Sequence, residues 1–202
     1  MPVLTRSARR CLEDMDDPNG SVLILREPVT CKAAAVWTHR QDTDVYSGAR
    51  KQTTERPQVD HILECQLTEL ALARTFQHGR QTRLKSMATA QATQWLREAV
   101  NGLDNLNVTS TKINSAKKGP FTAALNRLQS GQLRSVSIQQ MARQGRGRWM
   151  LEDGTWSRIE AAVVASFDQL QSRDVETLPA AGEVISESVE ELQAILGGLG
   201  FM

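Results

Sequence analysis

A change in hydrophobic period near the middle of this 202-residue chain most constrains how it can fold. From Leu84 to Ala99, apolar residues recur at the i, i+3, i+4, i+7 spacing that is typical of an amphipathic helix. The stretches on either side, residues 56–63 (RPQVDHIL) and 106–110 (LNVTS), are short and β-prone. The sequence therefore predicts two short strands, the first ending near Asp60 and His61, with a helical insertion between them.

Local signals predict further elements before and after this centre. Residues 21–29 form an apolar run that predicts a strand or a buried extended segment. Residues 36–56 have no helical period and predict a loop with a turn at Ser47-Gly48. Ser110 or Thr111 can cap a helix that runs to residue 119. Pro120 suits the first position of a separate helix, which Gly131 would close.

The last third of the chain carries three more signals. Asp153-Gly154 lies between β-prone residues and predicts a two-residue hairpin turn. Residues 159–170 have a helical pattern, and residues 189–199 predict an acidic amphipathic helix or a partly disordered end.

Four segments follow from these elements. They are residues 1–43, which pack on the core; residues 44–131, the core with its helical insertion at 66–100; residues 132–178, a basic loop, hairpin and helix; and residues 179–202, an acidic tail or helix.

Composition favours a soluble intracellular protein. Hydrophobic residues make up 40% of the chain and charged residues 23%, and no apolar run reaches the roughly 18 residues of a membrane helix. The charged N-terminus lacks the apolar segment of a secretory signal. Three cysteines without a CxxC pair indicate a reducing compartment. We therefore expect no membrane partner, and the nucleus remains open for a eukaryotic or host-delivered protein.

The net charge of +1 conceals a strong asymmetry along the chain. Residues 105–151 contain eight Lys or Arg residues and no Asp or Glu, whereas residues 152–202 contain ten acids and two bases. A basic block without interleaved acids is typical of a polyanion-binding surface. Nucleic acid is therefore the expected partner. The candidate contacts are Lys112, Lys117, Lys118, Arg143, Arg146 and Arg148.

A set of polar residues could form a hydrolytic site if the helix after the second strand packs against the end of the first. Asn114, Lys117 and Lys118 lie at i, i+3 and i+4 and share one helix face. Asp60 and Asn114 offer the oxygen ligands that Mg²⁺ or Mn²⁺ prefers. His61 could take a proton from the attacking water. Neighbours on a strand point to opposite faces, so Asp60 and His61 can converge only where the strand twists or ends.

The stretch VDHI, followed by NLNVTSTKINSAKKG, resembles the HNH endonucleases of the His-Me finger (ββα-metal) group. Asn105-Leu106 supplies the family's N-L, Asn114 follows Asn105 by nine positions, Lys117 by three more, and Gly119 closes the run. The resemblance covers at most residues 44–119.

The resemblance implies a fold and a set of roles. The fold class is α+β, a mostly helical domain built around a ββα-metal core with a helical insertion between its strands. Asp60 and Asn114 would be the metal ligands, His61 the general base, and Asn105 a structural residue that ties the loop. The expected function is metal-dependent hydrolysis of nucleic acid, DNA favoured over RNA.

The chain departs from the family in three places. Where many members carry a Cys₄ zinc site it has Asp44, Ser47, Ser110 and Ile113, so no structural zinc is expected. About forty residues separate His61 from Asn105, more than the usual loop. Glu64 replaces a frequent Pro; it could approach the metal, but a surface or helix-start carboxylate is the preferred interpretation.

Two alternatives to the nuclease remain open at this stage. One is a catalytically silent nucleic-acid-binding module of the same fold, and the other is an interaction protein that acts through its acidic tail. The sequence leaves open the strandedness of the substrate, its sequence preference and the biological role.

Overall fold

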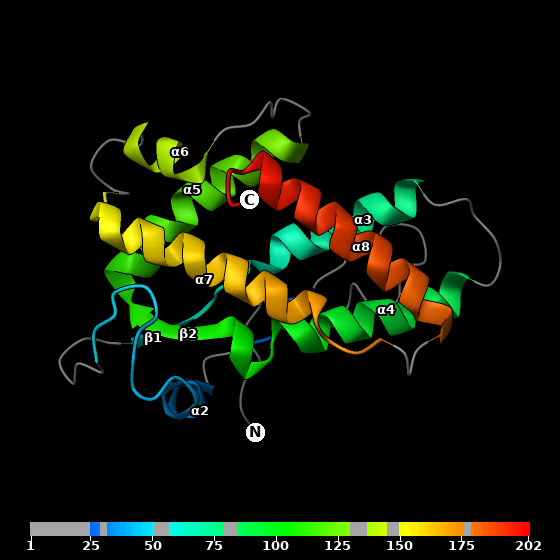
Figure 1. Ribbon diagram of the computed structural model, residues 1–202, viewed down its shortest axis with the longest axis horizontal. Helices are drawn as coiled ribbons and strands as arrows, with labels where there is room; N and C mark the ends of the chain where they lie inside the picture. Colours follow the sequence, from blue (N-terminus) through cyan, green and yellow to red (C-terminus); the bar gives the residue numbers. More distant parts are fainter. Residues whose placement is uncertain are drawn as a thin grey trace, which may run out of the picture.

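The computed structural model describes residues 25–28, 32–50, 57–78, 85–129, 137–144, 150–175 and 179–202. Helices surround one small antiparallel sheet, which confirms the α+β class and the mostly helical character (Figure 1). The expectations for residues 1–24, for Arg146 and Arg148, and for a helix end at Gly131 lie outside the described residues.

The sheet consists of β1 (Pro57–His61) and β2 (Leu106–Ser110), both where the sequence predicts them. The strands pair antiparallel with Asp60 opposite Asn107 and His61 opposite Leu106. The 3₁₀ helix η3 (Leu103–Asn105) leads directly into β2. The carboxyl end of β1 therefore lies beside the start of β2, and Asp60 and His61 fall at that end of the sheet.

The predicted helical insertion is confirmed as α3 (Cys65–His78) and α4 (Lys85–Val100). Its apolar faces are buried in the main core, with Leu67, Leu72 and Leu96 at most 1% exposed. Because α3 begins four residues after β1 ends, the insertion is anchored at the site end of the sheet.

Helix α5 (Thr111–Gln129) follows β2 without a loop. The Ser110 hydroxyl accepts a hydrogen bond from the Ile113 N–H, which confirms the predicted cap. The predicted division into two helices at Pro120 is wrong, because α5 continues through it. Proline removes the hydrogen bond to the residue 116 carbonyl, but Ala116 and Phe121 are both buried, so packing holds the helix on both sides. Helix α6 (Ile138–Gln144) packs on α5.

The hairpin predicted at Asp153-Gly154 is also wrong, because α7 (Asp153–Gln171) begins there. The Glu152 carbonyl accepts the N–H groups of Thr155 and Trp156 and starts the first turn. Trp156, Ile159, Val163 and Phe167 are all buried at helical spacing. This apolar face outweighs the local turn preference of Asp-Gly. The predicted helix at 159–170 is confirmed as part of α7.

Helix α2 (Ala33–His39) lies in a region that the sequence predicts as loop. It packs Val36 and Trp37 against Leu106 and Val108 of β2, in a small core of its own. Seven residues are too few for a hydrophobic period to be recognised. The predicted turn beyond it is confirmed: Gly48 has φ +70° and its N–H bonds the Asp44 carbonyl.

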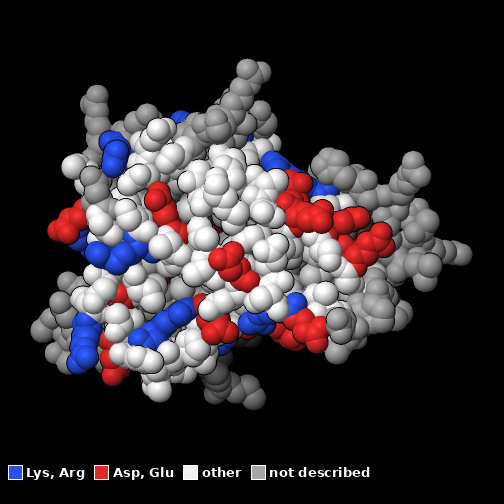
Figure 2. Space-filling model, in the orientation of Figure 1, with Lys and Arg blue, Asp and Glu red and all other residues white. Residues whose placement is uncertain are grey.

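Helix α8 (Pro179–Gly198) is the helical alternative for the C-terminal segment, and it belongs to the core rather than to a tail. It lies along α3 and α4 with Ile185, Leu192 and Leu196 at most 1% exposed (Figure 1). Its acidic residues Glu187 and Glu190 lie on the exposed side, where Figure 2 shows acidic side chains over this helix. A separable acidic tail that masks a basic groove therefore does not fit this helix.

Within the described ranges, none of the helices combines the length and apolarity needed to cross a bilayer.

Candidate functional site

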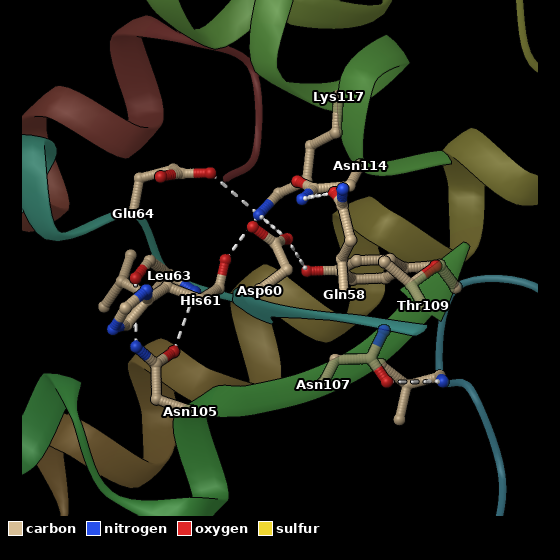
Figure 3. Close-up of polar contacts among 12 residues, drawn as sticks. Gln58, Asp60, His61, Leu63, Glu64, Asn105, Asn107, Thr109, Asn114 and Lys117 are labelled. Atoms are coloured by element: carbon tan, nitrogen blue, oxygen red, sulfur yellow. Dashed lines mark hydrogen bonds and ion pairs between the residues drawn. The ribbon is translucent and has the colours of Figure 1, made fainter. Parts of the chain in front are cut away.

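Asp60 and His61 lie on opposite faces of β1, so the expected single site is divided in two (Figure 3). The Asp60 carboxylate faces α5, where its Oδ2 accepts hydrogen bonds from Lys117 Nζ at 2.7 Å and from the Tyr46 hydroxyl at 2.8 Å. The His61 ring faces the end of α4, where its Nε2 lies 3.0 Å from Asn101 Oδ1. The regular alternation of side chains along a strand accounts for the division.

The Lys117 ammonium is the centre of the polar cluster on the α5 side. Its side chain has no exposed surface. Besides Asp60, Nζ contacts Glu64 Oε1 at 2.9 Å and the His61 carbonyl oxygen at 2.5 Å. Nζ also lies 5.4 Å from the Tyr46 ring centre and 5.2 Å from that of Phe121. Three oxygens thus satisfy the three donors of one ammonium.

The cluster keeps Lys117 charged. Burial lowers the lysine pKa, but the carboxylates of Asp60 and Glu64 outweigh burial, so the pKa lies well above its usual value. Burial also raises the pKa of Glu64, although Lys117 opposes the rise. Arg26 approaches Glu64 Oε2 at 3.7 Å, and its side chain is about half exposed. Two carboxylates therefore share one buried lysine and one arginine at the surface.

Glu64 was expected at the surface or at a helix start, and the structure places it at a helix start. Its carbonyl accepts the N–H of Leu67 at the start of α3. Its side chain, however, is turned inward to Lys117 and is 9% exposed. The sequence offers no local sign of this, because the two residues are 53 positions apart.

The hydrogen bonds of Asn101 fix the tautomer of His61. Asn101 Nδ2 donates to the carbonyls of Leu25 at 2.8 Å and Arg97 at 2.7 Å, and a carbonyl oxygen can only accept. Oδ1 is therefore the atom that faces His61 Nε2, and it also accepts the Glu27 N–H at 3.0 Å. The imidazole must carry its hydrogen on Nε2, which leaves the lone pair on Nδ1.

His61 is a weaker base here than a free imidazole. Burial lowers its pKa to about 4, with Arg26 and Lys117 adding to the fall and the Asn101 hydrogen bond opposing it. The ring is 1% exposed. At neutral pH it is uncharged, as a general base must be, but its affinity for a proton is reduced.

Asn105 ties together the segments that meet at the end of the sheet. Its Oδ1 accepts the Leu63 N–H at 2.7 Å and the Ser166 hydroxyl at 2.8 Å, and its Nδ2 donates to the carbonyls of Leu63 and Val100. The side chain thus joins the loop after β1, the end of α4 and α7. This geometry matches the loop-tying role that the resemblance implies for Asn105.

Asn114 lies one turn before Lys117 on the α5 face that looks toward β1. Its Nδ2 donates to Gln58 Oε1 at 2.7 Å, and Gln58 shares the strand face of Asp60. The structure therefore brings Asp60, Asn114 and Lys117 to one interface between β1 and α5 (Figure 3).

The candidate nucleic-acid contacts separate by exposure. Lys112 and Lys118 are exposed on α5, whereas the buried Lys117 does not suit the phosphate contact expected of it. Arg143 is exposed at the end of α6 and lies near Glu160. Arg146 and Arg148 lie outside the described residues.

The positions that the resemblance assigns to a zinc site, Asp44, Ser47, Ser110 and Ile113, all line one surface pocket of about 210 Å³. Asp44 organises the turn beside it. Its two carboxylate oxygens accept hydrogen bonds from the Asn107 amide, the Thr109 hydroxyl, the Ser47 hydroxyl and the Tyr46 N–H. Hydrogen bonds centred on Asp44 therefore tie this turn to β2.

Comparisons with known proteins add no family to this geometry. No protein-family model matches the chain, and neither the curated proteins nor the solved structures contain a match.

The residues at the β1–α5 interface fit a hard divalent cation in donor type. Among the described residues, no three His, Cys, Asp or Glu side chains form a ligand set. Oxygens of Asp60, of Glu64 and of the His61 carbonyl nevertheless converge on one cation, the Lys117 ammonium. Oxygen donors of this kind are those that Mg²⁺ and Mn²⁺ prefer. In this structure the cation among these oxygens is the Lys117 ammonium itself.

We expect Lys117→Met to destabilise the protein by about 3–5 kcal/mol, because it leaves two buried carboxylates without their lysine. Urea unfolding at pH 7 measures the loss. Lys118→Met, which removes the exposed neighbouring charge, should change the unfolding free energy by at most about 0.5 kcal/mol. Equal effects of the two substitutions would contradict the central role of the buried ammonium.

The lowered pKa of His61 predicts a pH-dependent loss of stability. The unfolded ring has a pKa near 6.5 and the folded ring one of about 4, so the unfolded state binds protons first as the pH falls. Between pH 7.5 and 5 the wild-type protein should lose about 2 kcal/mol of unfolding free energy through this residue. The loss should stop growing below pH 4.

Urea unfolding of His61→Gln at both pH values isolates this contribution, since the other titrating groups cancel in the comparison. If His61→Gln lost as much stability on acidification as the wild type, the burial of His61 would not be what lowers its pKa.

Proposed function

We propose that this protein is a metal-dependent endonuclease that hydrolyses phosphodiester bonds in nucleic acid, with DNA favoured over RNA. The observation that supports it best is the meeting of Asp60, Asn114 and Lys117 between β1 and α5. Asn105 ties the loop that follows β1. These residues also have the spacing of the HNH pattern.

Each residue has a distinct task in this proposal. Asp60 and Asn114 hold Mg²⁺ or Mn²⁺, which supplies charge stabilisation for the phosphate and the leaving oxygen. His61 takes the proton from the attacking water through its free nitrogen. Lys112 and Lys118 lie exposed on α5 and contact neighbouring phosphates.

The conformation described here is a closed one for such an enzyme. The ring of His61 is covered, and Lys117 occupies an oxygen of Asp60. Activity therefore requires that the His61 ring be exposed and that it reach the face of β1 that carries Asp60, and a metal at Asp60 Oδ2 requires that the ammonium leave this oxygen. An exposed imidazole would also regain a pKa near 6.5, which suits a general base at neutral pH.

Cleavage of plasmid DNA and of single-stranded DNA and RNA, each with Mg²⁺ or Mn²⁺, tests the proposal. His61→Ala and Asp60→Asn should each lower the cleavage rate by at least about 100-fold, because they remove the base and a metal ligand. His39→Ala is the matched histidine control and should cleave normally. No cleavage of any substrate, or undiminished cleavage by His61→Ala, would refute a nuclease of this kind.

A catalytically silent nucleic-acid-binding module is the second candidate. What favours it is the buried ion pair of Lys117, which gives the Asp60 carboxylate a permanent partner without any metal. The exposed lysines of α5 would then be the functional surface.

This candidate predicts metal-independent, salt-dependent binding. Lys112→Ala and Lys118→Ala should each reduce the slope of log K against log salt by about 1, as loss of one phosphate contact does. Fluorescence anisotropy with labelled DNA measures the slope. Ser115→Ala, an exposed neutral neighbour, and Asn114→Ala should leave it unchanged. Binding that requires a divalent cation would exclude the silent module.

A further inference from the structure

The segment 25–28 reaches the carboxyl end of β1 from a distant part of the chain. The Leu25 side chain is fully buried, and its N–H donates to Glu69 Oε1 at 2.6 Å. Two further backbone bonds of the segment go to one side chain, Asn101, which accepts the Glu27 N–H and donates to the Leu25 carbonyl.

The same amide holds the ring of His61. Asn101 Oδ1 is the acceptor for both the Glu27 N–H and the His61 Nε2–H, each at 3.0 Å. A bond to segment 25–28 and a bond to the imidazole therefore meet on one oxygen atom. Movement of Asn101 or of the segment changes the surroundings of His61 directly.

Arg26 joins the segment to the cluster on the other face of β1. Its guanidinium lies 3.7 Å from Glu64 Oε2, and its charge also lowers the pKa of His61. Because this side chain is about half exposed, solvent weakens the ion pair. The electrostatic hold on the segment is thus much weaker than the buried contacts of Lys117.

We propose that Asn101 is a latch and residues 25–28 a cover that together keep His61 in an inaccessible state, and that the cover opens while the sheet and its helices remain folded. We expect a four-residue segment that is anchored by the Leu25 side chain and by hydrogen bonds to Asn101 and Glu69 to open at a lower free energy than the core. This proposal rests on the proposed function only for the role of the exposed imidazole as a general base. The opening of the cover itself is independent of catalysis.

The wild-type chain provides the first test. Hydrogen exchange and carbethoxylation of His61 by diethyl pyrocarbonate at pH 7 are followed together by mass spectrometry in low concentrations of urea. We expect the Glu27 amide to exchange at least about 10-fold faster than the paired amides of β1 and β2. We also expect His61 to react at least about 10-fold faster than opening of the paired strands would allow. His39, which is partly exposed, serves as the internal reference for reagent activity.

A wild-type result can overturn the proposal without any variant. If His61 reacts only as fast as the sheet unfolds, with the same dependence on urea, there is no separate cover. If His61 reacts as fast as His39 in the absence of urea, the ring is not covered in solution.

Two variants separate the cover from the latch. Leu25→Asp detaches the buried side chain of the cover and leaves Asn101 in place, whereas Asn101→Ala removes the latch. Both should raise the reactivity of His61 at least about 10-fold with the β1 and β2 amides still protected. Glu27→Ala removes the side-chain ion pair with Lys32 but leaves the backbone bond to Asn101, so it should raise the reactivity of His61 far less than Asn101→Ala does. Unchanged His61 reactivity in a folded Leu25→Asp protein would overturn the proposal.

The imidazole nitrogen signals report the latch separately. In the wild type, ¹⁵N NMR should show the Nε2–H tautomer, and Asn101→Ala should give a mixture of tautomers. A wild-type ring protonated on Nδ1 would contradict the role of Asn101. None of these measurements depends on cleavage of nucleic acid. A covered His61 in a protein without nuclease activity would refute the proposed function alone. An exposed His61 in an active nuclease would refute the cover alone.

Discussion

The ammonium of Lys117 is the contact on which the arrangement around the sheet depends. It joins α5 to the Asp60 side chain and His61 carbonyl of β1, and to Glu64 at the start of α3. A lysine with no exposed surface is tolerated only where each donor finds an acceptor and a negative charge lies close. Moving α5 away from β1 would leave a charge of either sign in the interior, so the position of α5 on β1 is fixed electrostatically as well as by packing.

Much of the fold could be predicted because its signals are local. The strands, the helical insertion and the Ser110 cap each follow from a few neighbouring residues. The errors arose where packing outweighs a local preference: Asp153-Gly154 favours a turn, yet the buried face of α7 makes it the first turn of a helix. Pro120 favours a helix start, yet buried residues on both sides keep α5 continuous.

The meeting of β1 and α5 could be predicted from the sequence, but the surroundings of each side chain could not. The spacing of Asp60, Asn114 and Lys117 correctly indicates residues that meet, because a strand end and a helix face are periodic. Burial is a property of the whole fold, and charged residues are rarely interior, so the ion pair of Lys117 with Glu64 has no local signal in the sequence. The hold of Asn101 on His61 spans 40 positions and likewise has no local signal.

The two candidate functions differ in what happens to one carboxylate oxygen. Asp60 Oδ2 already accepts the Lys117 ammonium and the Tyr46 hydroxyl, and a divalent cation could not share it with an ammonium at 2.7 Å. A metal at this oxygen would therefore replace the Lys117 ammonium, and Glu64 and the His61 carbonyl would lose that donor. Such an exchange would release one of the contacts that join α5 to β1, because Lys117 belongs to that helix. If the protein is a nuclease with its metal at this oxygen, metal binding and the release of Lys117 from Asp60 are thus one event, whereas a binding module has no need to separate them.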